Sequence, residues 1–144
     1  MIALVVGAAL AFAFLAWTRA QLEAGRRLYA IGLAVTALLY LLFALIGRAA
    51  GRSLGVEALG LALYGGAAWL GFRKSLTLLA VGWAMHPVWD VVLHLQYPGA
   101  AYTPDWYPWG CISFDLMVAG AVFVSGTAAA RPDGAPNSVL APPR

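Results

Sequence analysis

Basic residues divide this sequence into long apolar segments, and none of the nine lies inside an apolar run. The runs are 1–17, 28–47, 54–72, 75–95 and 110–130. A helix needs about 20 residues, at about 1.5 Å each, to cross a hydrocarbon core about 30 Å thick. Each run approaches that length, although the first is the shortest. The pattern predicts five membrane-spanning helices, or four if the first run is cleaved or lies in the interface.

Composition supports lipid as the solvent of this chain. Hydrophobic residues make up 62% of the 144 residues and charged residues only 10%, with a mean hydropathy of +0.80. Soluble domains carry roughly 25% charged residues, and a chain this small could not bury so much apolar surface. We therefore expect an all-α, polytopic bundle in the cell membrane. Residues 1–130 would form its single transmembrane domain, with membrane lipid as its surroundings.

The distribution of Lys and Arg predicts the orientation. With five spans, seven basic residues fall on one side, and only Arg48 and Arg52 fall on the other. Because the more basic side is normally cytoplasmic, we expect the N-terminus outside and the C-terminus in the cytoplasm. A cleaved leader would have basic residues before its apolar run, which residues 1–17 lack. The segment 131–144, with four prolines, is predicted to be a disordered cytoplasmic tail.

The remaining local signals exclude several functions. The net charge of +3 is explained by topology, and no basic helix face or motif indicates nucleic-acid binding. Cys111 is the single cysteine, so neither an intrachain disulfide nor a cysteine-only metal site can form. The sequence contains no phosphate-binding glycine loop and no recognisable Ser/His/Asp pattern. No reaction, catalytic residue or organic cofactor is therefore predicted.

Polar side chains recur at helical spacing near the end of the fourth run. His86, Asp90 and His94 are four residues apart. In an α-helix each such step advances about 40° around the axis and about 6 Å along it. The three side chains should therefore form one slightly spiralling polar stripe. Cys111 and Asp115 repeat the spacing at the start of the fifth run.

Depth predicts that these side chains meet. The fourth span should cross outward and the fifth should return, which puts Cys111 near the level of His94 and Asp115 near that of Asp90. Glu57 enters from the same side. An ionised carboxylate at a span centre costs roughly 2.5–3.5 kcal/mol, and no Lys or Arg lies within the spans. These carboxyl groups must be protonated, paired with histidine, hydrated or bound to a cation.

A transition-metal site is the leading hypothesis, because mixed His and carboxylate ligands suit Zn, Fe, Mn or Cu. The candidate ligands are Asp90, His94, Asp115, His86, Cys111 and Glu57. His86 and His94 would lie about 12 Å apart along the helix, which is too far for one ion. A single site would use Asp90, His94 and Asp115, with Cys111 or Glu57 as a further ligand. His86 would then orient Asp90, and a two-ion site using both histidines is the alternative.

Other interpretations remain open from the sequence alone. The cluster could carry protons or cations, because His and Asp chains build proton relays. It could instead lock helices together in a structural subunit that binds a membrane partner or a second copy of the chain. The loop 96–109 is rich in Tyr and Trp, so it is an aromatic belt at the membrane interface, a lid over the cluster, or both.

The same residues carry a resemblance to a known family. The order His-x-x-Trp-Asp-x-x-x-His, a Trp/Pro-rich loop and Gly-Cys-x-x-Phe-Asp resembles a family of short bacterial integral membrane proteins known as a domain of unknown function. Within residues 82–125, the matching positions are His86, Trp89, Asp90, His94, Gly110, Cys111, Phe114 and Asp115. The resemblance implies a bacterial inner-membrane protein and carries no activity with it.

Overall fold

The computed structural model describes residues 1–21, 24–96 and 98–129, and these are almost entirely helical. The elements are α1 (Ile2–Ala20), α2 (Gly25–Ile46), α3 (Gly51–Lys74), α4 (Leu76–Trp89), η1 (Asp90–Leu95), η2 (Pro98–Ala101) and α5 (Trp106–Ala129). The short element η1 is a π-helix that continues α4, and η2 is a 3₁₀ turn. The predicted tail, 131–144, lies outside the described residues.

Five helical segments are long and apolar enough to cross a membrane, as the sequence predicted, and the fourth consists of α4 together with η1. The centres of the predicted spans are confirmed, and the observed helix boundaries differ from the predicted ones by a few residues. The fifth helix shows the largest change at its start, which lies at Trp106 rather than 110. Which side of the membrane each end faces remains a prediction.

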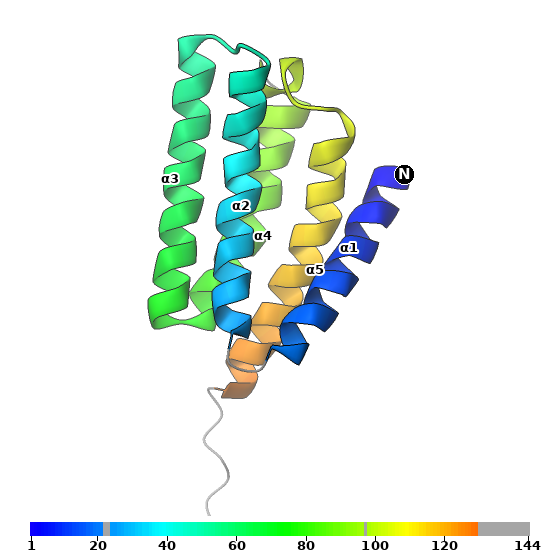
Figure 1. Ribbon diagram of the computed structural model, residues 1–144, viewed down its shortest axis with the longest axis vertical. Coiled ribbons are helices and arrows are strands. Elements are labelled where there is room, and N and C mark those ends of the chain that lie inside the picture. The colour runs from blue at the N-terminus through cyan, green and yellow to red at the C-terminus, as the bar shows by residue number, and fades with distance from the viewer. Residues whose placement is uncertain (22–23, 97, 130–144) are drawn as a thin grey trace, which may run out of the picture.

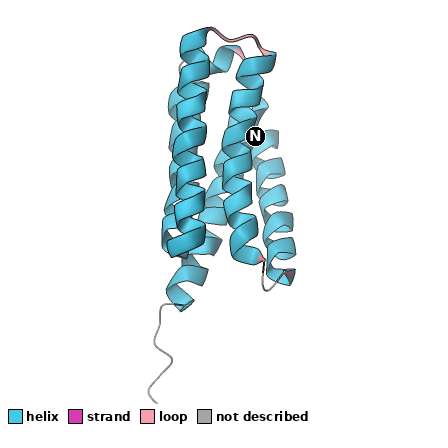
Figure 2. Cartoon of the chain, turned by 60° about the vertical axis from the view of Figure 1, so that its left-hand side comes forward, coloured by secondary structure: helices cyan, strands magenta, loops and turns pink. Residues whose placement is uncertain are grey.

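The five long helices form an up-and-down bundle (Figures 1 and 2). α1 packs along α5, α5 also packs on α4, and α3 packs on both α4 and α2. The N-terminus, the α2–α3 connection and the segment between η1 and α5 lie at one end of the bundle, which we call the loop end. The turn at Ser75 between α3 and α4 lies at the opposite end.

Tight connections hold these helices in register. At the end of α2, Arg48 adopts a φ of 53°, while the N–H of Ala49 donates to the carbonyl oxygen of Ala44 at 2.9 Å. This is the Schellman arrangement that ends many helices, although glycine is the usual residue at its left-handed position. At the opposite end, a Cβ atom on Gly71 would lie 2.7 Å from that of Leu79. Glycine there lets α3 and α4 pack closely beside their short turn.

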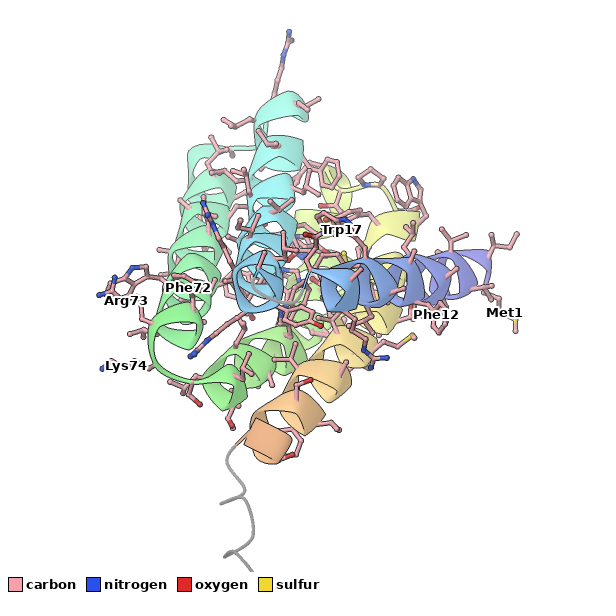
Figure 3. All side chains as sticks on the ribbon, turned by 60° about the horizontal axis from the view of Figure 1, so that its bottom comes forward. Met1, Phe12, Trp17, Phe72, Arg73 and Lys74 are labelled. Carbon is pink, nitrogen blue, oxygen red and sulfur yellow. The ribbon has the colours of Figure 1, made fainter. Side chains whose placement is uncertain are left out.

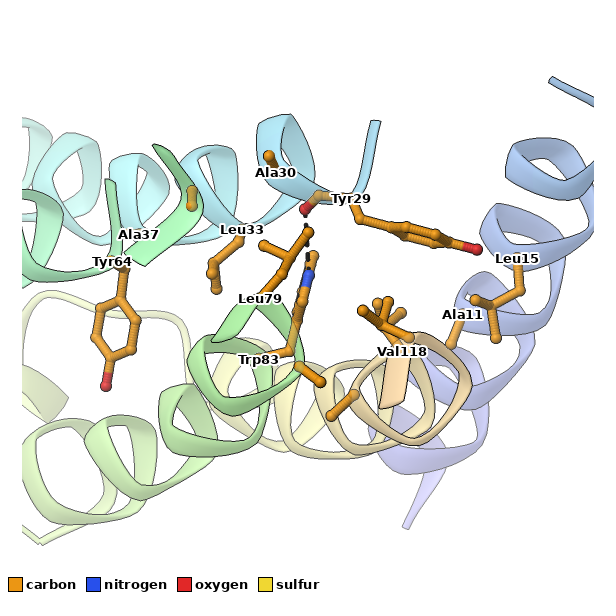
Figure 4. Packing of buried hydrophobic residues seen from close by; sticks show 14 residues of the cluster. Ala11, Leu15, Tyr29, Ala30, Leu33, Ala37, Tyr64, Leu79, Trp83 and Val118 are labelled. Atoms are coloured by element: carbon orange, nitrogen blue, oxygen red, sulfur yellow. Dashed lines mark hydrogen bonds between the residues drawn. The ribbon is translucent and has the colours of Figure 1, made fainter. Parts of the chain in front are cut away.

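The apolar core is built from all five long helices, and Figure 4 shows its packing from close by. Leu33, Leu79 and Val118 from α2, α4 and α5 are completely buried there. The indole N–H of Trp83 donates to the backbone oxygen of Tyr29 at 3.1 Å, so the one polar atom of this large side chain is satisfied. Among the described residues, the buried acidic and histidine side chains lie on the loop-end side of Trp83.

Large apolar side chains also cover the outer surface. Phe12, Trp69 and Phe123 are 71%, 60% and 50% exposed. In Figure 3, Phe12 lies on the outer side of α1, while Arg73 and Lys74 extend from the end of α3. A soluble monomer rarely exposes such extensive apolar surface, so this distribution fits lipid-facing sides with basic residues at a helix end.

Candidate metal centre

A buried group of three titratable side chains joins α4 and α5, and we call it the inner group: His86, Asp90 and Asp115. The Nδ1 atom of His86 is hydrogen-bonded to Oδ2 of Asp115 at 2.8 Å. The same nitrogen lies 3.6 Å from Oδ1 of Asp90. All three side chains are 0% exposed. Asp90 and Asp115 therefore converge on a single histidine, at the depth expected from counting residues along the two spans.

Most of the hydrogen-bonding capacity of the inner group is unused. Both carboxylate oxygens of Asp90, Oδ1 of Asp115 and Nε2 of His86 are buried without a hydrogen-bond partner among the described residues. A buried polar atom without a partner costs about 1–3 kcal/mol, and natural structures contain few of them. Four such atoms in three adjacent side chains make this an unusually polar buried group among the described residues.

The three side chains of the inner group could hold a metal ion. One ligand atom from each of the three residues can be chosen so that all three lie within 4.8 Å of one another. Ligands about 2.1 Å from a tetrahedral zinc ion lie about 3.4 Å apart. Small side-chain rotations that draw the donors together by about 1 Å would therefore create three protein ligands and leave one position open.

A second buried group, the outer group, lies nearer the loop end and consists of Glu57, His94 and Tyr102. The Nε2 atom of His94 is hydrogen-bonded to Oε1 of Glu57 at 3.0 Å, and the hydroxyl of Tyr102 donates to the same oxygen. The other oxygen, Oε2, has no hydrogen-bond partner. Burial and the bond to Glu57 raise the pKa of Tyr102 above its ordinary value, so this hydroxyl remains a donor at physiological pH.

This grouping differs from the single site expected from the sequence. We expected His94 to join Asp90 and Asp115, with His86 orienting Asp90. In the structure His86 contacts both aspartates, and His94 contacts Glu57 instead. The six candidate ligands thus separate into two groups and Cys111.

The π-helix η1 explains the separation. Its hydrogen bonds join residues five apart, so it has about 4.4 residues per turn instead of 3.6. Over the four residues from Asp90 to His94, it rotates about 70° less than an α-helix would. The stripe therefore does not continue its spiral, and His94 turns towards α3 rather than α5.

Aromatic side chains separate and enclose the two groups. The ring of Tyr40, on α2, stacks on His94 with centroids 3.7 Å apart, and its centroid is 5.8 Å from that of His86. Tyr64, on α3, contacts His86 edge-on at 4.8 Å. Neither tyrosine was predicted as a site residue from the sequence. The available signal was that each interrupts an otherwise apolar span with a hydroxyl group.

Cys111 is not one of the three residues whose donor atoms converge in the inner group. It is buried and borders a largely apolar groove of about 390 Å³ between α1, α2 and α5. Gly7 allows α1 to approach α5, because a Cβ on Gly7 would collide with the carbonyl oxygen of Gly110. Cys111 is thus a wall residue of the groove, and it is not in the set of donors that converge.

The aromatic loop combines both of its expected features. Tyr102 covers Glu57 through its hydrogen bond, which is what a lid residue would do. Trp106 and Trp109 are 64% and 46% exposed, as residues of an interfacial belt would be. Gly99 lets the loop lie on η1, because a Cβ there would be 2.5 Å from the carbonyl oxygen of Leu93.

Comparison with curated proteins and with solved structures gave no match. A family model matches residues 1–128, which is far more of the chain than the segment 82–125 that carried the resemblance in the sequence. All six candidate ligands lie inside the matched region. The chain belongs to DUF6010, a family of unknown function.

Proposed function

We propose that this protein is an intramembrane metal-binding protein that holds one divalent transition-metal ion between His86, Asp90 and Asp115. The observation that carries the proposal is the convergence of three fully buried donor side chains within 4.8 Å. Zn, Fe, Mn and Cu are the metals that suit such a mixture of imidazole and carboxylate ligands.

Charge balance favours a divalent cation over an ion pair alone. Two ionised aspartates and a neutral histidine carry a charge of −2, which a divalent ion cancels. Among the described residues, these aspartates form ion pairs only with His86. Without a metal, a neutral inner group needs two protons shared among its three side chains. Because an uncompensated charge in the low-dielectric interior costs several kcal/mol, the metal-bound and doubly protonated forms are the two low-energy states.

A bound ion would give the inner group chemical capability. With three protein ligands, a fourth position stays open for water or substrate, as in catalytic zinc sites. Such an ion lowers the pKa of bound water towards neutrality and polarises oxygen atoms of a substrate. The apolar groove bordered by Cys111 supports a lipid-soluble substrate if the site is catalytic.

Metal analysis of purified protein tests the proposal. Wild-type protein expressed in metal-supplemented medium is expected to carry about one ion per chain, and Asp90→Ala and Asp115→Asn are expected to carry none. Asp105→Asn is the matched control, because Asp105 is an exposed carboxylate at the loop end. Equal, sub-stoichiometric metal in wild type and Asp90→Ala would refute the proposal.

Proton or cation transfer is the second candidate, and the hydrogen-bonded series Tyr102, Glu57 and His94 favours it. Beyond the inner group, no buried acidic or histidine side chain among the described residues continues that series. Towards Ser75, the buried polar side chains among the described residues are hydroxyl groups such as those of Thr18 and Tyr29. Liposomes containing this protein should show a flux that His86→Ala and Asp115→Ala abolish, and flux unaffected by these changes would exclude this function.

A further inference from the structure

The outer group borders a hollow that reaches the surface at the loop end. Glu57 and Tyr102 line this hollow of about 350 Å³ together with Ser53, Gly99 and the exposed residue Arg52. In contrast, His86, Asp90 and Asp115 are fully buried. Glu57 is therefore the carboxylate that an ion arriving through this hollow would meet before the inner group.

The outer group has donor atoms to offer such an ion. Oε2 of Glu57 and Nδ1 of His94 are buried without a partner, and both side chains are at most 2% exposed. Oε1 of Glu57 and Nε2 of His94 already face each other at 3.0 Å, which is close to the separation of two ligands on one metal ion. Two protein ligands are fewer than the three or four of a permanent zinc site, so an ion there would retain water and leave readily.

The ring of Tyr40 adjoins both this position and the inner group. Tyr40 stacks on His94 and also lies near His86, with centroid distances of 3.7 and 5.8 Å. Its hydroxyl is buried and has no hydrogen-bond partner among the described residues. The same hydroxyl lies close to Asp90, so Tyr40 adjoins both groups.

We propose that Glu57 and His94 form an outer station that receives a divalent transition-metal ion from the hollow and passes it to the inner group. Tyr102 keeps the station closed, because its hydroxyl occupies Oε1 of Glu57. An arriving ion displaces that hydrogen bond and the one between His94 and Glu57, and the proton shared by His94 and Glu57 leaves to water. This inference rests on the proposed function, since it supplies the route by which the inner group is loaded.

Loading kinetics with Co²⁺ in lipid nanodiscs test the station separately from the inner group. Glu57→Gln keeps an oxygen that can accept both hydrogen bonds but removes the charge, so the fold should persist. We expect it to slow Co²⁺ uptake about tenfold, because the charge that lines a cleft changes the on-rate of an ion by about 10–10³. Without the Glu57 carboxylate, Arg52 is the one charged side chain among the described residues that lines the hollow, and it repels a cation. The final stoichiometry and cobalt spectrum of Glu57→Gln should match wild type. Tyr102→Phe should load faster, and Asp105→Asn should load like wild type.

The outcomes separate the two proposals. If wild type binds no Co²⁺, the proposed function and the outer station fall together. If wild type binds Co²⁺ and Glu57→Gln loads equally fast, only the outer station is overturned. If Glu57→Gln abolishes bound Co²⁺ as Asp115→Asn is expected to do, Glu57 holds the resident ion, and a separate station is again overturned.

Discussion

Replacing the two aspartates of the inner group, singly and together, should reveal a strong energetic coupling between α4 and α5. The changes are Asp90→Asn and Asp115→Asn, which keep the side-chain shape and remove the charge. Both carboxylates face one nitrogen, with Asp115 at 2.8 Å and Asp90 at 3.6 Å from His86 Nδ1. Their effects on stability should therefore depend on each other.

The size of the expected changes in unfolding free energy follows from these distances. A hydrogen bond to a charged group contributes about 1.5–3 kcal/mol and a neutral one about 1 kcal/mol, so Asp115→Asn should cost about 1–2 kcal/mol. In that variant Asp90 needs a shift of less than about 1 Å to take over the bond to His86. In the double variant no carboxylate remains to do so. We expect the double variant to be about 1 kcal/mol less stable than the sum of the single effects, within the usual range for one network.

Unfolding in mixed detergent micelles, with a chelator present, measures the three free energies. The matched control combines Asp90→Asn with Asp105→Asn, because Asp105 is exposed and lies outside the inner group. That pair should be additive to within about 0.5 kcal/mol. Strict additivity of Asp90→Asn and Asp115→Asn would show that the two helices do not build a common site.

Three further predictions concern metal binding, a helix end and topology. Metal binding at the inner group should release about two protons per ion, because its two carboxylates and histidine must lose the two protons that neutralise them. Calorimetry in buffers of different ionisation enthalpy measures the number of protons released, and a number near zero would contradict the charge balance. Arg48→Gly should stabilise the protein by about 0.5–1 kcal/mol, since a residue with a side chain is strained at the positive φ observed there; unchanged or lower thermal stability would contradict the strain. A reporter fused after residue 129 should be active only in the cytoplasm, and periplasmic activity would reverse the orientation predicted from the basic residues.

The sequence predicted the bundle because each span is long and apolar enough to be identified on its own. It also predicted the meeting of Asp90 and Asp115, because their depth follows from counting residues along two neighbouring antiparallel helices. The pairing of His94 could not be predicted in this way. Residue spacing assumes α-helical rotation, and the π-helix Asp90–Leu95 changes that rotation within a single turn.

Tyr40 and Tyr102 show a second limit of the sequence. Tyrosine is common at membrane interfaces, so neither position stood out from the other aromatic residues. Their roles depend on packing between helices distant in sequence. Tyr40 on α2 stacks against His94, and Tyr102 in the loop donates to Glu57 on α3. Such contacts become visible only when the helices are placed side by side.

The most direct test of a metal centre is to locate the ion itself. Crystals grown with Zn²⁺ or Co²⁺ and measured at the absorption edge of the metal would give an anomalous difference peak at each bound ion. The predicted result is one strong peak within about 2.3 Å of a donor atom from each of His86, Asp90 and Asp115. A strong peak only at Glu57 and His94, or no peak in metal-saturated crystals, would contradict the assignment of the inner group as the metal centre.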